Sequence, residues 1–332
     1  MRYEDAVASQ PDNLEVTRER VHAALSRSDL APWRGGTLAV VAMGAASHSG
    51  WVLVDALRRA GRRVANLDAS ALLEDAPPTA FADSFVFISE SGRSSETVGA
   101  AERVGPGARL GLTNVADAPL ARAVDLNVTL GHGEDSPVYT VGYTATLQAL
   151  GLVAEAIGAG TTGEDFASLP AQLSQVLSVN AAPMGELADR LAPLGALDFV
   201  GRGASLASAA EAALLFREAT RTPTAVFETR QYLHGPMEPL TGERGCVVFG
   251  DGREVELARY LADREIPVVL LTSAEIEPTG TLAVVSLPAA APVSRAVLEI
   301  APVQLLAGGV ARRRGLGIDG FVYRQDDTKL AG

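Results

Sequence analysis

The residues best suited to binding an anion lie between Ser89 and Thr97, where five of nine side chains carry a hydroxyl group. The apolar run 84–88 before them predicts a buried strand, and a helical pattern starts at about Glu96. The first N–H groups of a helix lack partners within the helix, and the helix dipole is positive there. The segment therefore predicts a phosphate site. A helix N-cap in a serine-rich turn is the alternative interpretation.

Two carboxylates that could move protons are Glu211 and Glu218, which stand seven residues apart in an alanine-rich and leucine-rich stretch. This spacing places both on one face of a helix, two turns apart. A carboxylate removed from water has a raised pKa and could carry a proton between adjacent carbons of a sugar. The alternative is that both are solvated, or paired with Arg217 or Arg221.

A histidine and a lysine complete the candidate set. His234 precedes Gly-Pro, which predicts a rigid turn, and a buried structural histidine is the alternative. Lys329 is the single lysine among 28 basic residues. Only an amine can form a Schiff base with a carbonyl, although a lone lysine near the chain end is also compatible with chance. No pair among the four histidines has metal-ligand spacing, so we expect no metal and no cofactor.

Strands that alternate with helices must position these side chains. In the first half we expect strands at 37–42, 63–67, 84–88, 110–114 and 126–130. In the second half we expect them at 197–200, 245–249, 266–272 and 282–287. Helices are expected at 51–59, 143–157, 166–192, 205–221 and 295–314. This alternation predicts an α/β fold with parallel sheets covered on both faces.

The two halves share a local pattern. Gly44-Ala45-Ala46-Ser47 and Gly203-Ala204-Ser205 each follow a strand and open a helix, and Gly203 follows Gly44 by 159 residues. A duplicated α/β domain is the simplest explanation. The domain boundaries that we predict are a helical lead-in 1–35, a first domain 36–160, a linker helix 161–192, a second domain 193–320 and a C-terminal tail 321–332.

Composition excludes several classes of partner. The chain has 332 residues, enough for two domains, and a net charge of −12, which argues against a nucleic-acid partner. It holds no uninterrupted apolar run of about 18 residues, so we expect no membrane partner and a cytoplasmic location. The single cysteine, Cys246, is expected in the core.

Taken together and in this order, the motifs resemble the double-domain form of the SIS (sugar isomerase) family. The resemblance is to the isomerase half of glucosamine-6-phosphate synthase and to stand-alone glucosamine-6-phosphate deaminases and fructosamine-6-phosphate deglycases. It rests on motifs spread over most of the chain: Ser89-Glu90-Ser91-Gly92 with Thr97, Gly201-Arg202-Gly203, Glu211 to Glu218, His234-Gly235-Pro236 and Lys329.

The resemblance implies two three-layer sandwich domains, each with a central, mainly parallel five-stranded sheet flanked by helices. It also implies a homodimer with shared active sites and a small-molecule sugar phosphate as the ligand. The implied catalytic residues are Glu218 as the proton shuttle between C1 and C2, His234 in ring opening from the neighbouring subunit, and Lys329 at the open-chain carbonyl. The implied substrate-binding residues are Ser47, Ser89, Glu90, Ser91, Gly92, Ser94, Thr97 and Glu211.

The sequence departs from the family pattern at several positions. Ala45-Ala46 replaces a Thr-Ser pair, Glu90 occupies a position often held by glutamine, and Leu215 and Val141 replace lysines of the synthase. The leading hypothesis is aldose–ketose isomerisation or deamination of an (amino)hexose 6-phosphate through an enediol or enamine. The alternative is a phosphosugar-binding sensor or regulator without catalysis.

Overall fold

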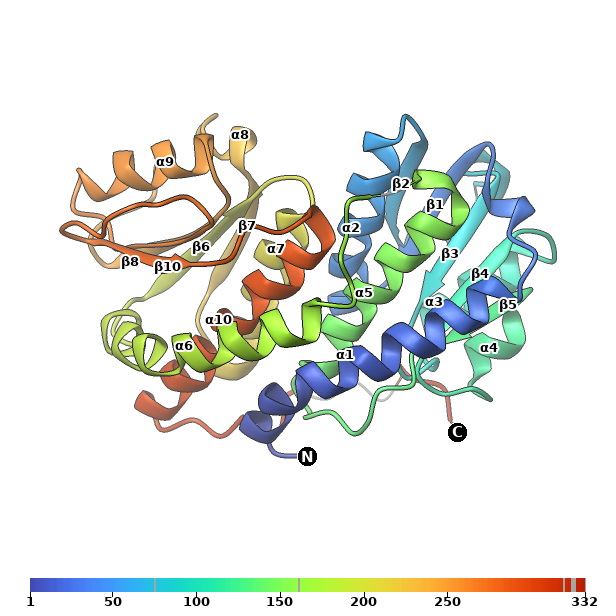
Figure 1. Ribbon diagram of the computed structural model, residues 1–332, viewed down its shortest axis with the longest axis horizontal. Coiled ribbons are helices and arrows are strands. Elements are labelled where there is room, and N and C mark those ends of the chain that lie inside the picture. The colour runs from blue at the N-terminus through green and yellow to red at the C-terminus, as the bar shows by residue number, and fades with distance from the viewer. Residues whose placement is uncertain (75, 161, 319, 324–326, 332) are drawn as a thin grey trace.

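The computed structural model, which describes residues 1–74, 76–160, 162–318, 320–323 and 327–331, contains two five-stranded sheets (Figure 1). The strand order is β2-β1-β3-β4-β5 in the first sheet and β10-β9-β8-β6-β7 in the second. All strand pairs within both sheets are parallel. Parallel strands need crossover helices, which is why strands and helices alternate along the chain.

The strands of the first sheet are β1 (Thr37–Ala42), β2 (Arg63–Asp68), β3 (Ser84–Ile88), β4 (Arg109–Thr113) and β5 (Leu126–Thr129). The helices of this half are α1 (Tyr3–Ser26), α2 (Gly44–Arg59), α3 (Ser95–Val104), α4 (Pro119–Ala123) and α5 (Val141–Ala154). The strands of the second sheet are β6 (Ala196–Gly201), β7 (Thr224–Glu228), β8 (Arg244–Phe249), β9 (Val268–Thr272) and β10 (Leu282–Ser286). The remaining helices are α6 (Leu169–Leu191), α7 (Ser205–Thr220), α8 (Thr229–Tyr232), α9 (Arg253–Ala262) and α10 (Pro292–Arg313).

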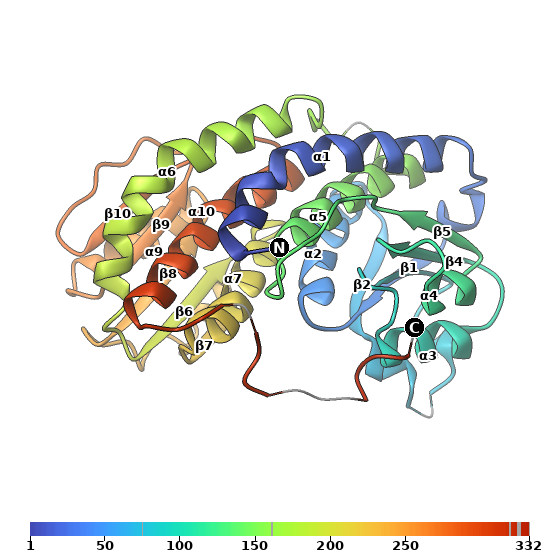
Figure 2. The same ribbon diagram turned by 90° about the horizontal axis from the view of Figure 1, so that it is seen from below.

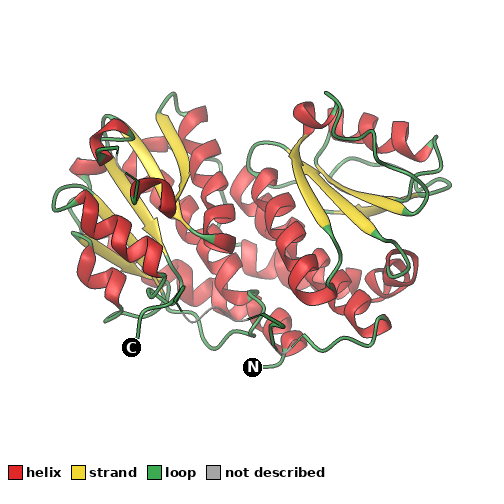
Figure 3. Cartoon of the chain, turned by 180° about the vertical axis from the view of Figure 1, so that it is seen from behind, coloured by secondary structure: helices red, strands yellow, loops and turns green. Residues whose placement is uncertain are grey.

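A thick layer of helices separates the two sheets, as Figure 3 shows. One apolar cluster runs through this layer and draws side chains from α2, α5, α7 and α10 as well as from both sheets. All 14 residues of α5 are buried. Two smaller clusters cover the outer faces of the sheets, under α3 and α4 in the first domain and under α8 and α9 in the second. The two halves therefore share a continuous core, and α2 and α7 pack directly against each other.

The predicted fold class is confirmed, with a small correction to the list of elements. The strand β7 was missing from the sequence-based list, and it lies at an edge of its sheet with only one of its five residues fully buried. Helix α2 begins at Gly44, seven residues or about two turns before the predicted start at residue 51. The repeat is also visible in the structure, because β6 begins 159 residues after β1. The five domain boundaries stay a prediction, and residues 324–326 and 332 of the predicted tail lie outside the described residues.

Helix α10 is long and apolar enough, by length and composition, to cross a membrane. However, 89% of its most apolar window is buried inside the fold. Its apolar residues thus meet other parts of the protein, as in a helix at the centre of a globular core.

Candidate functional site

The hydroxyl-rich segment forms a compact loop between β3 and α3. Ser94 is the N-cap of α3, and its Oγ accepts hydrogen bonds from the N–H of Thr97 at 3.4 Å and from Thr97 Oγ1 at 3.0 Å. The Oγ of Ser89 accepts from the N–H of Ser94 at 3.4 Å. Gly92 adopts a φ of +64°, and a Cβ there would lie 2.3 Å from the Cβ of Ala118. The loop therefore needs glycine at this position.

The C-terminal tail pairs with this loop. The N–H of Leu330 donates to the carbonyl of Arg93 at 2.9 Å, and the N–H of Ser95 donates to the carbonyl of Thr328 at 3.1 Å. Figure 2 shows the tail returning from α10 to end beside α3. The Nζ of Lys329 donates to Ser91 Oγ at 3.4 Å. The tail thus places the single ammonium group of a lysine side chain at the hydroxyl loop.

Glu90, the acidic member of the loop, has a histidine partner that the sequence did not reveal. Its Oε1 lies 3.5 Å from Nε2 of His132, whose side chain is 1% exposed. Burial raises the pKa of the Glu90 carboxyl, whereas His132 acts to lower it. Because His132 follows β5 and Glu90 follows β3, only the parallel sheet brings them together. This contact gives the Glu90 carboxylate an imidazole neighbour within the first domain.

Asp135 connects the loop to the second domain electrostatically. Its carboxylate accepts the N–H groups of Thr140 at 3.1 Å and Gly142 at 2.8 Å, at the start of α5. Its charge also raises the pKa of both Glu90 and Glu211. The charge of Asp135 therefore acts on a carboxyl group of each domain, Glu90 in the first and Glu211 in the second.

Helices α2 and α7 bring a histidine to the candidate carboxylates. His48 Nδ1 lies 3.2 Å from Oε2 of Glu211, whose side chain is only 3% exposed. Burial raises the pKa of Glu211, and the hydrogen bond with His48 acts in the opposite direction. For Glu218, burial and the neighbouring charge of Glu211 raise the pKa to about 7. Such a carboxyl group can both take up and release a proton near neutral pH.

A cavity of about 420 Å³ lies beside this pair and is lined by His48 and Ser47. The Oγ of Ser47 donates to Asp68 at 3.1 Å, so its hydroxyl hydrogen is engaged within the first domain. Leu215, at the position of a synthase lysine, is 1% exposed and packs into the shared core. An unpaired lysine would be costly at such a site.

His234 lies apart from the other candidate residues. It is exposed in the turn after α8, and its side chain has no hydrogen bond or ion pair with any residue that the structure describes. The structure thus groups Ser89, Ser91, Ser94, Thr97 and Lys329 in one cluster, and Glu211 and Glu218 with His48 in another. His48, His132 and Asp135 are additions that the sequence analysis missed.

The two α/β domains thus carry a hydroxyl loop at a helix N-terminus and a carboxyl group whose pKa is raised to about 7, which are the features of an anion site and of an acid–base group. Residues 191–311 match the SIS domain family. The chain therefore contains a SIS domain, and it is homologous to part of the glutamine–fructose-6-phosphate aminotransferases. One relative from Symbiobacterium thermophilum is 29% identical over 305 residues, which are 85% of this chain and 50% of the relative.

Solved structures agree on the fold. The C-terminal domain of glucosamine-fructose-6-phosphate aminotransferase from Francisella tularensis superposes with a TM-score of 0.82 at 19% identity, covering 96% of this chain and 98% of that one. Glucosamine-6-phosphate deaminase from Thermotoga maritima superposes with a TM-score of 0.80 at 18% identity, covering 98% of each chain. The chain spans about half or less of the length of the curated relatives that it matches.

Proposed function

We propose that this protein is a sugar-phosphate isomerase or deaminase that acts on a hexose 6-phosphate or its amino derivative. Glu218 transfers a proton between C1 and C2 of the open-chain sugar, through an enediol or an enamine. The observation that carries the proposal is the pKa of Glu218, which burial and Glu211 raise to about 7. A base that is half protonated near neutral pH suits a reaction in which one group takes and returns the same proton.

The hydroxyl loop supplies the binding part of the proposal. Ser89, Ser91 and the N-terminus of α3 hold the phosphate, with the ammonium of Lys329 beside them. Relatives named as an aminotransferase that uses fructose 6-phosphate and as a glucosamine-6-phosphate deaminase support this choice of ligand. A cytoplasmic location is part of the proposal, in keeping with a net charge of −12 and the burial of α10.

Proton NMR in D2O tests the chemistry directly. Fructose 6-phosphate and glucosamine 6-phosphate are incubated in turn with the protein, and deuterium entry at C1 or C2, new sugar signals and ammonia are recorded. We expect exchange with at least one substrate, and loss of that exchange in Glu218→Gln. Binding of both sugars without any exchange or conversion would contradict the proposal and would favour the sensor hypothesis.

We propose further that the active protein is a homodimer in which His234 acts in the site of the neighbouring subunit. Its exposed position and the absence of a side-chain partner among the described residues support this arrangement. Mixing inactive Glu218→Gln and His234→Ala proteins under exchange conditions should restore about a quarter of the sites, because half of the dimers then carry one intact site. If His234 acts within its own chain, mixing restores nothing.

A further inference from the structure

A second charged cavity, of about 510 Å³, lies at the carboxyl ends of β6 and β8. Both domains contribute to its walls. Asp55 and Arg59 come from α2 in the first domain, and Arg202, Asp251 and Arg295 come from the second. Its volume lies within the range of small-molecule sites, and no residue of the proposed catalytic set lines it.

The internal repeat relates this cavity to the candidate active site. The offset of 159 residues that takes Gly44 to Gly203 also takes Arg59 to Glu218. The active site is expected at the loops after β1 and β3, next to the C-terminal half of α7. The cavity lies at the loops after the equivalent strands β6 and β8, next to the C-terminal half of α2. It is therefore the counterpart of the active site in the duplicated fold.

The counterpart has lost the groups that would support catalysis. An arginine, Arg59, occupies the sequence position equivalent to Glu218, so the proton-transferring carboxyl group has no equivalent there. The hydroxyl-rich loop after β3 is replaced by the short segment Gly250-Asp251-Gly252 after β8. The cavity thus keeps the location of a ligand site and has a different recognition chemistry.

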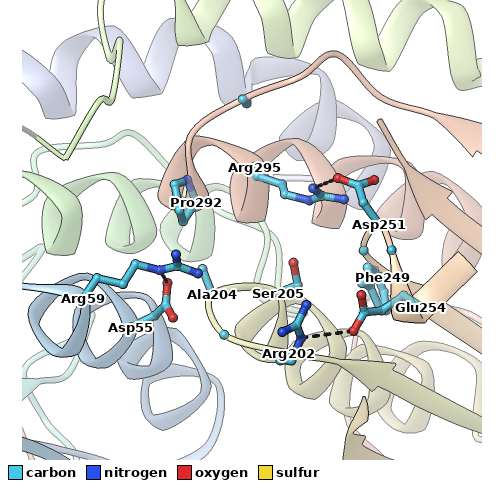
Figure 4. Close-up of a pocket in the computed structure, with 14 residues that line it drawn as sticks. Asp55, Arg59, Arg202, Ala204, Ser205, Phe249, Asp251, Glu254, Pro292 and Arg295 are labelled. Carbon is cyan, nitrogen blue, oxygen red and sulfur yellow. Dashed lines mark hydrogen bonds and ion pairs between the residues drawn. The ribbon is translucent and has the colours of Figure 1, made fainter. Parts of the chain in front are cut away.

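That chemistry consists of alternating guanidinium and carboxylate groups (Figure 4). Arg59 Nε donates to Asp55 at 2.7 Å on one side of the cavity. Across the cavity, Arg202 pairs with the buried Glu254 at 3.3 Å, and Arg295 pairs with Asp251. Arg295 also retains one buried nitrogen, Nη2, that has no hydrogen-bond partner in the described part of the chain.

Three guanidinium groups and three carboxylates suit a ligand that both donates and accepts hydrogen bonds. Arginine can only donate and an ionised carboxylate can only accept, whereas a hydroxyl group does both. A bare phosphate would satisfy the arginines, but its charge would be repelled by Asp55, Asp251 and Glu254. The lining therefore favours a neutral, hydroxyl-rich ligand surface over a simple anion.

We propose that this cavity is a second, non-catalytic binding site for a polyhydroxylated metabolite the size of a hexose, recognised through its hydroxyl groups by the Arg–carboxylate pairs. The ligand bridges the two domains, because it contacts α2 on one side and the β6–α7 and β8–α9 loops on the other. Helix α2 also carries His48 and α7 carries Glu211, so occupancy of the cavity is coupled to the His48–Glu211 pair.

Isothermal titration with glucose and with glucose 6-phosphate tests the site by binding alone, independently of any turnover. The double variant Ser89→Ala/Ser91→Ala weakens the candidate active site and serves as the background. In this background we expect one molecule of glucose to bind per chain, and glucose 6-phosphate to bind more weakly because the carboxylates repel its phosphate. Arg59→Ala or Arg202→Ala should then weaken that binding at least about tenfold, because each removes charged hydrogen-bond donors.

Of the two substitutions, Arg59→Ala is less expected to disturb folding, since the Arg59 side chain is 65% exposed and its loss leaves the core intact. Arg253→Ala is the matched control, because Arg253 forms a comparable exposed pair with Glu256 outside the cavity lining. The proposal is overturned if the background binds neither sugar, or if the Arg59 and Arg202 variants bind like the control. It is also overturned if only glucose 6-phosphate binds and inorganic phosphate displaces it, which would show a simple anion site.

Discussion

Replacing Glu218 by glutamine should stabilise the protein above neutral pH while removing its proposed activity. The pKa of Glu218 is about 7, against 4.5 for an ordinary glutamate. Since one pKa unit is worth about 1.4 kcal/mol, ionising this carboxyl costs the folded state about 3 kcal/mol. The protonated form favours folding, so its contribution is fully present below pH 4.5 and is lost as the pH rises through 7.

The assay is urea unfolding at pH 5 and pH 8, at one fixed protein concentration. The free energy of unfolding of Glu218→Gln, relative to that of the wild type, should rise by roughly 2 to 3 kcal/mol between the two pH values. Glu102→Gln, which changes an exposed carboxylate on α3, is the control and should show no such dependence. Equal pH profiles for wild type and Glu218→Gln would refute the reasoning that burial holds a proton on this group.

Three further predictions concern single contacts. Arg109 holds the pKa of Asp125 at about 2. Because Asp125 is exposed and solvent screens this pair, Asp125→Asn should lower the free energy of unfolding at pH 7 by only about 1 kcal/mol, a difference that shrinks as the pH falls from 4 to 2. Urea unfolding checks this, and an unchanged difference at pH 2 would contradict it. His132→Ala leaves Glu90 free to face a bound phosphate and should weaken fructose 6-phosphate binding roughly tenfold, as measured by titration calorimetry, whereas His22→Ala should not. Lys329→Arg should preserve binding but abolish any adduct that borohydride traps and mass spectrometry detects, and a trapped adduct in this variant would exclude Lys329 as the amine.

The fold was largely predictable because buried parallel strands are continuous apolar runs. The runs 37–42 and 84–88 became β1 and β3, and every residue of β3 is buried. β7 was not predicted because its apolar run, Ala225-Val226-Phe227, is only three residues long. The strand lies at the sheet edge, where these three side chains stay partly or fully exposed. The start of α2 was placed late because Gly44 and Ser47 are poor helix formers, which the shared core nonetheless holds in the first turn.

The sequence predicted those parts of the candidate site whose residues are close together in the chain. It did not predict the contacts between residues that only the folded structure brings together. The hydroxyl loop and the pair Glu211 and Glu218 follow from local spacing. His132 meets Glu90 only because β5 and β3 end at the same edge of one sheet, and His48 meets Glu211 only because α2 packs on α7. A histidine in an isolated sequence gives no sign of a partner that lies 163 residues away.

The repeat also yields two equivalent sites, and only one of them has the carboxyl group that the proposed reaction needs. Each sheet presents a loop and a helix N-terminus at its carboxyl edge, so the duplicated fold offers two ligand sites. A proton-transferring carboxyl group needs a raised pKa, and Glu218 has one because burial and the charge of Glu211 raise its pKa more than His48 lowers it. At the equivalent site, in the loop after β8, Asp251 is held ionised by Arg295, which keeps its pKa well below the ordinary value. The same fold therefore has a carboxyl group with a raised pKa at one site and ion pairs at the other, and these arrangements suit proton transfer and ligand binding respectively.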